Sequence, residues 1–281
     1  MKRAVRERTA GPLVLAVRGR PGPPPLRFEA ADGGRLLLRQ EGRPVLLGRV
    51  DGANEGLFLH HLGGYRSPLP PPRAALTRSG DHNPVHQYAR WLEEAPNGPL
   101  HDARWLLGER RVFPPYVWTG DLVRDWPDCY LDWCAGGWQG VVPLRPLSPP
   151  DAPRVKAYRR QAREGTLAPV LLWSVTALDG WLILDGHDRA VAALAEGGDP
   201  ACVVLTRVLD EDVWRRQSDE CVEEHLRRTA APTPGPRRPA TDQALAATLA
   251  DLPYDPARTV SWPLPGGPAA WDALAAHSVL D

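Results

Sequence analysis

The residues best suited to chemistry lie together in the segment 184–189, which reads Leu-Asp-Gly-His-Asp-Arg. Asp185 supplies a carboxylate that can bind a metal ion or accept a proton. His187 and Arg189 supply hydrogen-bond donors, and the planar guanidinium suits phosphate because it can bond two oxygens at once. Gly186 permits a positive φ or a close backbone approach. A carboxylate and a cation on such a turn indicate phosphate-handling chemistry.

The elements around this turn are predicted from apolar patterns and from glycine. A helix from about Arg154 ends at Gly165, and glycine just past a helix is a common stop. Strands, a short helix and a further strand follow, at 167–175, 181–184, 190–195 and 201–208. The turn therefore joins a strand to a helix, whose unpaired N–H groups favour an anion, above all phosphate.

Two stretches within residues 154–208 resemble a known superfamily. They are Arg-Glu-Gly-Thr-Leu-Ala-Pro-Val at 163–170 and Leu-Ile-Leu-Asp-Gly-His-Asp-Arg at 182–189. A helix that ends in glycine, a leucine-x-proline-apolar strand start and a Gly-x-x-Arg turn are features of the ParB/sulfiredoxin superfamily. The nearest variant is the free-serine kinases of this fold, whose turn reads Asp-Gly-His-His-Arg. The resemblance implies an α+β fold, with a ParB/sulfiredoxin-like mixed sheet and packed helices.

The resemblance also implies a nucleotide site made of Gly186, His187, Asp188, Arg189 and Thr166. The nucleotide would be ATP or ADP, with CTP as an alternative, bound together with Mg²⁺. Asp188 departs from the kinase pattern, because it stands where the kinases have their second histidine. A carboxylate there repels phosphate unless a metal ion bridges the two.

The catalytic residues implied in the same way are Asp185, Glu164 and His187, with Asp185 also the metal ligand. Asp185 or Glu164 would take the proton from an attacking hydroxyl group, since catalysis of phosphoryl transfer is mostly positioning and charge neutralisation. The turn contains no cysteine, and this excludes sulfiredoxin chemistry.

Composition limits the other classes of function. The chain has 281 residues, 43% of them hydrophobic, and 34 basic side chains balance 34 acidic ones. No general basic field exists to attract nucleic acid or a membrane. The basic start at residues 1–8 lacks the apolar core of a signal peptide, and no stretch is long enough to span a membrane. We therefore expect a cytoplasmic protein with reduced thiols, in which Cys202 is a buried strand residue.

The sequence divides into three parts. Residues 1–145 form a β-rich and then helical region, 146–228 the nucleotide-binding domain, and 229–281 a Pro-rich linker with short helices. The expected elements of the first part are strands at 13–17, 35–39 and 45–50 and helices at 85–92 and 100–107. The expected linker is 231–240, preceded by a charged helix at 210–228.

A tryptophan-rich segment ends the first part. Its members are Trp105, Trp118, Trp126, Trp133 and Trp138. Packing of the N-terminal region against the central unit is the preferred interpretation. The alternatives are a lid over a small amine-bearing substrate and a surface for a protein partner.

Three functions remain. The first is a nucleotide-dependent phosphotransferase acting on a small hydroxyl-bearing molecule, serine or an amino-acid-like compound. The second is a nucleotide-binding regulatory or scaffold protein without turnover, which Asp188 favours. The third is a ParB-like DNA-associated protein, disfavoured by the neutral charge and by the absence of a helix-turn-helix pattern after residue 208.

Overall fold

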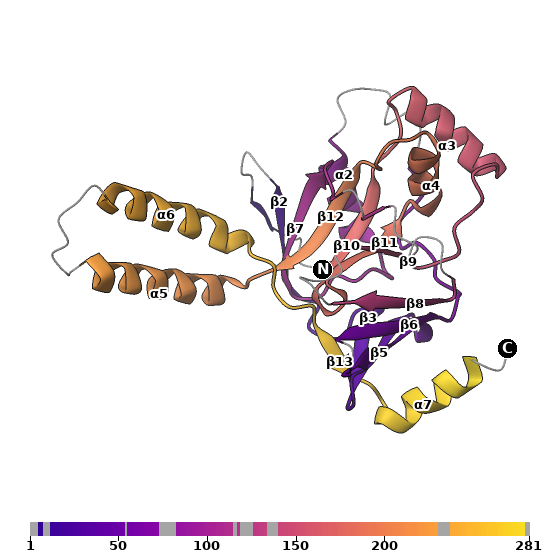
Figure 1. Cartoon of the computed structure of the whole chain (residues 1–281), viewed down its shortest axis with the longest axis horizontal. Coiled ribbons are helices and arrows are strands. Elements are labelled where there is room, and N and C mark those ends of the chain that lie inside the picture. Colours follow the sequence, from indigo (N-terminus) through magenta and orange to yellow (C-terminus); the bar gives the residue numbers. More distant parts are fainter. Residues whose placement is uncertain are drawn as a thin grey trace.

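The computed structural model describes residues 5–7, 12–53, 55–72, 83–114, 117–118, 126–133, 140–229 and 237–278. Over these residues the protein is an α+β structure built on two mixed sheets, with helices on their outer surfaces and one helical hairpin that projects from the body (Figure 1).

The larger sheet has seven strands in the described part of the chain. Their spatial order is β1 (Val5–Glu7), β2 (Leu13–Val17), β7 (Ala103–Arg110), β12 (Cys202–Val208), β10 (Val170–Val175), β11 (Gly180–Asp185) and β9 (Val141–Pro143). Strands that precede residue 145, where a domain boundary was expected, therefore hydrogen-bond in one sheet with strands that follow it. Cys202 is buried in β12, as expected.

The smaller sheet has six strands among the described residues. Their order is β13 (Ser261–Pro263), β3 (Leu26–Ala31), β4 (Arg35–Gln40), β5 (Arg43–Asp51), β6 (Gly56–His61) and β8 (Asp128–Asp132). The expected hairpin at 35–50 is confirmed as β4 and β5. Its two-residue turn has positive φ at Glu41 (49°) and Gly42 (83°), which suits the twist of paired strands.

The main core lies between the two sheets. Alternate residues of β10 divide between the two faces of the larger sheet, since successive strand side chains point in opposite directions. Trp173 faces the smaller sheet, where its ring lies 5.5 Å from that of Phe28. Val170 and Leu172 face the other side and pack with Ala190. Burial on both faces explains why β10 is continuously apolar.

Residues 100–107 were expected to be helical, and this prediction is wrong. They include the first part of β7, which pairs with β2 on one side and β12 on the other. Tertiary pairing decides the structure of such a short apolar run, because its periodicity fits either element. The neighbouring helix, α2 (Pro84–Glu94), is confirmed and begins at the Asn83 cap.

Of the remaining helices in the described residues, three lie against the body and two project from it. α3 (Pro153–Arg163) and α4 (His187–Ala195) lie side by side, and α7 (Gly267–Ser278) packs on the smaller sheet through Trp271. α5 (Glu211–Thr229) and α6 (Arg237–Asp251) form the projecting hairpin. Because α6 begins at Arg237, the Pro-rich linker is shorter than the expected 231–240. No helix in the described ranges is both long and apolar enough to cross a bilayer.

Candidate functional site

The turn that the sequence singles out joins β11 to α4. β11 ends at Asp185 and α4 begins at His187, with Gly186 between them at φ 99°. A Cβ atom at Gly186 would lie 2.7 Å from Nη2 of Arg189. Glycine is required here both for the left-handed backbone and for the close approach of the guanidinium.

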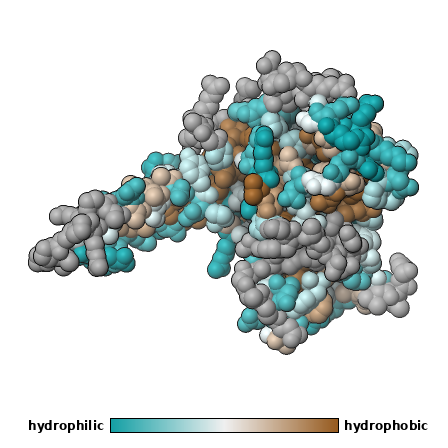
Figure 2. All heavy atoms as spheres, turned by 45° about the horizontal axis from the view of Figure 1, so that its top comes forward, coloured by the Kyte–Doolittle hydropathy of each residue, from teal (hydrophilic) through white to brown (hydrophobic). Residues whose placement is uncertain are grey.

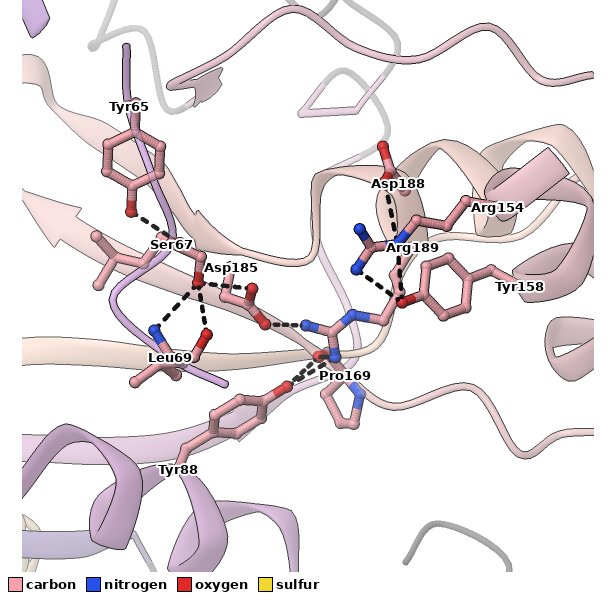
Figure 3. Close-up of polar contacts among 11 residues, drawn as sticks. Tyr65, Ser67, Leu69, Tyr88, Arg154, Tyr158, Pro169, Asp185, Asp188 and Arg189 are labelled. Carbon is pink, nitrogen blue, oxygen red and sulfur yellow. Dashed lines mark hydrogen bonds and ion pairs between the residues drawn. The ribbon is translucent and has the colours of Figure 1, made fainter. Parts of the chain in front are cut away.

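Arg189 is enclosed by the protein and only 2% exposed. Its Nη1 donates to Oη of Tyr88 at 2.8 Å and to the carbonyl oxygen of Pro169 at 2.6 Å, and its Nη2 pairs with the Asp185 carboxylate. The hydroxyl of Tyr88 in turn donates to the same carbonyl oxygen at 2.5 Å. Figure 3 shows the guanidinium pointing into this network. Arg189 therefore holds the turn, α2 and the start of β10 together.

Asp185 is held from a second side by the segment that follows β6. Oγ of Ser67 donates to Oδ1 of Asp185 at 2.7 Å and accepts from the backbone N–H of Leu69 at 3.2 Å. Nearby, the Tyr65 hydroxyl donates to the carbonyl oxygen of Leu184 at 2.7 Å. Both oxygens of Asp185 thus have protein partners, and its side chain is 12% exposed.

His187 is buried and uncharged. Its Nε2 lies 3.0 Å from the backbone nitrogen of Leu144, which donates to it, so the neutral ring carries its proton on Nδ1. Burial, followed by repulsion from Arg145 and Arg189, lowers the pKa of His187 well below its ordinary value. A neutral ring in this position fixes the loop after β9 but supplies no positive charge to an anion.

The accessible positive charges at the turn are two arginines that converge on Asp188. Nη2 of Arg145, from the loop between β9 and α3, lies 2.9 Å from Oδ1 of Asp188. Nε of Arg154, in the first turn of α3, lies 3.6 Å from Oδ2 (Figure 3). Oγ of Ser148 donates to Asp188 at 2.9 Å. The arginine side chains are 36% and 63% exposed, whereas Asp188 is 6% exposed.

The helices α3 and α4 run in the same direction. Their first turns meet through Arg154 and Asp188, while at their last turns Arg163 reaches Glu196 at 2.8 Å. The starts of both helices therefore lie together at the turn, and both ends lie together on the opposite side.

Glu164 and Thr166 follow the end of α3, so the structure does not bring them to the turn. Glu164 is 45% exposed and pairs with Arg160 at 3.5 Å. Oγ1 of Thr166 lies 3.4 Å from the carbonyl oxygen of Gln161. Of the residues implied by the resemblance, Asp185, Gly186, His187, Asp188 and Arg189 are brought together.

Both carboxylates of the turn already have protein partners. Asp185 is engaged by Ser67 and Arg189, and Asp188 is engaged by its two arginines. Across the ranges that the structure describes, no three His, Cys, Asp or Glu side chains gather as a metal site. Mg²⁺ is usually held by one or two carboxylates together with substrate phosphates.

Five residues of the site were not predicted from sequence: Ser67, Tyr88, Arg145, Ser148 and Arg154. Tyr88 was expected only as an apolar residue of its helix, and Arg154 only as the start of the helix that ends at Gly165. The other three lie in irregular segments, where no periodic pattern exists to show which way a side chain points.

The tryptophan-rich segment mainly serves packing in its described part. Trp105 and Trp118 are buried, and the ring of Trp118 meets that of Phe113 at 5.7 Å. Trp133 packs against the main core, and the ring of Trp126 stacks on His61 at 4.2 Å. Trp138 lies outside the described residues.

No family model, curated protein or solved structure matches this chain. The basis for a function is therefore the chemistry of the turn. It consists of a helix start, two exposed arginines that pair with Asp188, and a second carboxylate, Asp185, anchored on both oxygens. Arg154 is also held by the hydroxyl of Tyr158, which lies 3.4 Å from its Nε and from its Nη2 (Figure 3).

Proposed function

We propose that this protein binds the phosphate groups of a nucleotide at the start of α4, with Arg145 and Arg154 as the phosphate ligands. One observation carries the proposal: two arginines from separate segments converge on the same side of a helix start while keeping exposed guanidinium groups. Guanidinium groups and the positive end of a helix dipole both favour phosphate. A nucleotide, rather than another phosphate compound, is suggested by the resemblance to the ParB/sulfiredoxin superfamily.

The same resemblance leads us to propose the ParB/sulfiredoxin-like fold for residues 146–228. What supports it is the order of elements, in which α3, β10, β11, the glycine turn, α4 and β12 follow one another as the two motifs imply. In this proposal Arg189 and His187 are positioning residues, because their polar atoms are used to fix the turn.

Asp188 forms ion pairs with both arginines. Its carboxylate thus pairs with the two guanidinium groups that a phosphate would use, so a phosphate must share or displace it. Such an internal competitor suits a protein that responds to nucleotide concentration rather than one that turns substrate over rapidly. A non-catalytic regulatory or scaffold role is therefore the form of the proposal that the geometry supports best.

Phosphoryl transfer to a small hydroxyl-bearing molecule is the second candidate, and Asp185 favours it. A carboxylate two residues before the start of α4 would stand close to where a terminal phosphate would lie. Its two oxygens are already engaged by Ser67 and Arg189, and the other expected base, Glu164, lies at the far end of α3.

Calorimetric titration with ATP, ADP and CTP tests the binding. Replacing Arg145 and Arg154 by alanine should weaken binding by about 10- to 100-fold for each arginine, since each forms charge-assisted hydrogen bonds. Arg163→Ala is the matched control, because Arg163 is a 56% exposed arginine on the same helix, at its other end. Unchanged binding by the double variant, or no binding of any nucleotide by the parent, would refute the proposal.

Turnover is tested separately, by a phosphoryl-transfer screen on small alcohols and amino acids. The second candidate requires a phosphorylated product, and it requires that Asp185→Asn binds nucleotide but forms no product. Tight binding without any product leaves the regulatory role.

A further inference from the structure

The helices α5 and α6 leave the body as an antiparallel pair (Figure 1). Nε2 of His225, near the end of α5, lies 2.7 Å from the carboxylate of Asp242, near the start of α6. The base of the hairpin is fixed to β7, where Nη1 of Arg104 donates to the carbonyl oxygens of Leu209 and Pro253 at 2.8 and 3.0 Å. The hairpin is therefore attached to the rest of the protein at its base, and the remainder of both helices projects away from the sheets.

α5 is 19 residues long and contains no buried residue. Its Val222 and Leu226 side chains are 36% and 60% exposed. On α6, Leu245 and Leu249 are only half-buried, and the alanines around them are exposed. Figure 2 shows hydrophobic residues at the surface of this projection, among hydrophilic ones.

Such a hairpin is poorly stabilised on its own. Helices in proteins gain most of their stability from packing an apolar face, and the surface ion pairs of α5 contribute little. A partner surface that buries Val222 and Leu226 of α5 would supply the missing packing. The small alanine side chains of α6 permit a close approach of another helix.

The charges of α5 indicate what covers it. The helix begins with Glu211 and Asp212 and ends with Arg227 and Arg228. Acidic residues outnumber arginines along α5, which disfavours nucleic acid and anionic membranes as partners. Two copies of α5 placed antiparallel would bring the acidic start of each beside the basic end of the other.

We propose that the hairpin is a homodimerisation element that packs against the hairpin of a second copy about a twofold axis. A twofold interface needs a self-complementary surface, and α5 has one, with apolar residues toward its second half and opposite charges at its ends. Val222 and Leu226 become buried in the dimer, and the terminal charges fix the antiparallel direction.

Sedimentation analysis of the full chain tests this directly. At about 100 µM, where a micromolar dimer is almost fully formed, the parent should have twice its chain mass of 30.9 kDa. The variant Val222→Glu/Leu226→Glu should sediment as a monomer. Val112→Glu is the matched control, because Val112 is an exposed valine on the body of the protein, and this variant should remain a dimer. A monomeric parent, or a dimeric double variant, would overturn the proposal.

Charge exchange tests the direction of packing with changes confined to the surface. Glu211→Arg/Asp212→Arg alone, and Arg227→Glu/Arg228→Glu alone, should each weaken the dimer by about tenfold or more, because like charges then face each other. An equal mixture of the two variants should form a heterodimer as tight as the parent dimer. Failure of the mixture to associate would show that the helices do not pair antiparallel.

Discussion

Replacing Arg189 by methionine should strongly destabilise the protein. The substitution keeps much of the side-chain volume but removes the donors to Tyr88 and Pro169 and the positive charge beside Asp185. Breaking a buried ion pair by removing one partner costs about 3–5 kcal/mol, because the other charge stays buried without compensation. Single domains have only about 5–15 kcal/mol of stability in total, so the loss would be large.

Urea unfolding followed by circular dichroism measures this loss. Arg90→Met is the control, since Arg90 is 67% exposed in an ion pair with Glu94 and should change stability by less than about 1 kcal/mol. The double variant Arg189→Met/Asp185→Asn should recover part of the loss, because it removes the unpaired charge. A cost below about 1 kcal/mol for Arg189→Met would show that the guanidinium does not hold the turn together.

Three further predictions concern the turn and the smaller sheet. Gly186→Ala should cost about 1–3 kcal/mol in urea unfolding, because φ is 99° and the new Cβ would meet the enclosed Arg189; a neutral effect would contradict the geometry. Because the pKa of His187 is lowered in the folded state, the unfolded state binds a proton below about pH 6.5 that the folded state does not bind. The free energy of unfolding should therefore decrease as the pH is lowered, by up to about 1.4 kcal/mol per pH unit. His187→Asn should flatten this dependence between about pH 6.5 and 5, and an unchanged slope would show that the ring titrates normally. Trp271→Ala should cost about 3–5 kcal/mol, since Trp271 is 6% exposed and its Nε1 donates to the Leu36 carbonyl at 2.9 Å. Hydrogen exchange in α7 that stays as slow as in the parent would contradict that role.

Much of the local structure around the turn could be predicted from sequence. The strands β10 and β11 and the helix α4 follow from apolar runs bounded by glycine, because burial on both faces of a sheet leaves a continuous apolar stretch. The prediction of a helix at 100–107 was wrong, because the apolar residues of this short run fit a helix as well as a strand. Its state is decided by β2 and β12, which lie far away in the sequence.

The site was predictable as a motif but not as an arrangement. The spacing of Asp185, His187 and Arg189 shows that they share a turn, yet it does not show which side chains face solvent. Tyr88 comes from a helix about a hundred residues earlier in the chain, and its hydroxyl helps to enclose Arg189. The exposed guanidinium that could meet a phosphate belongs instead to Arg145, which lies in a loop with no periodic pattern.

An anion that binds at the start of α4 must compete with Asp188 for Arg145 and Arg154. Isothermal titration of ATP into the parent and into Asp188→Asn measures this competition directly, because the substitution keeps the side-chain size and removes the competing charge. The proposal predicts that Asp188→Asn binds ATP at least about tenfold more tightly than the parent. Weaker or unchanged binding by Asp188→Asn would contradict it.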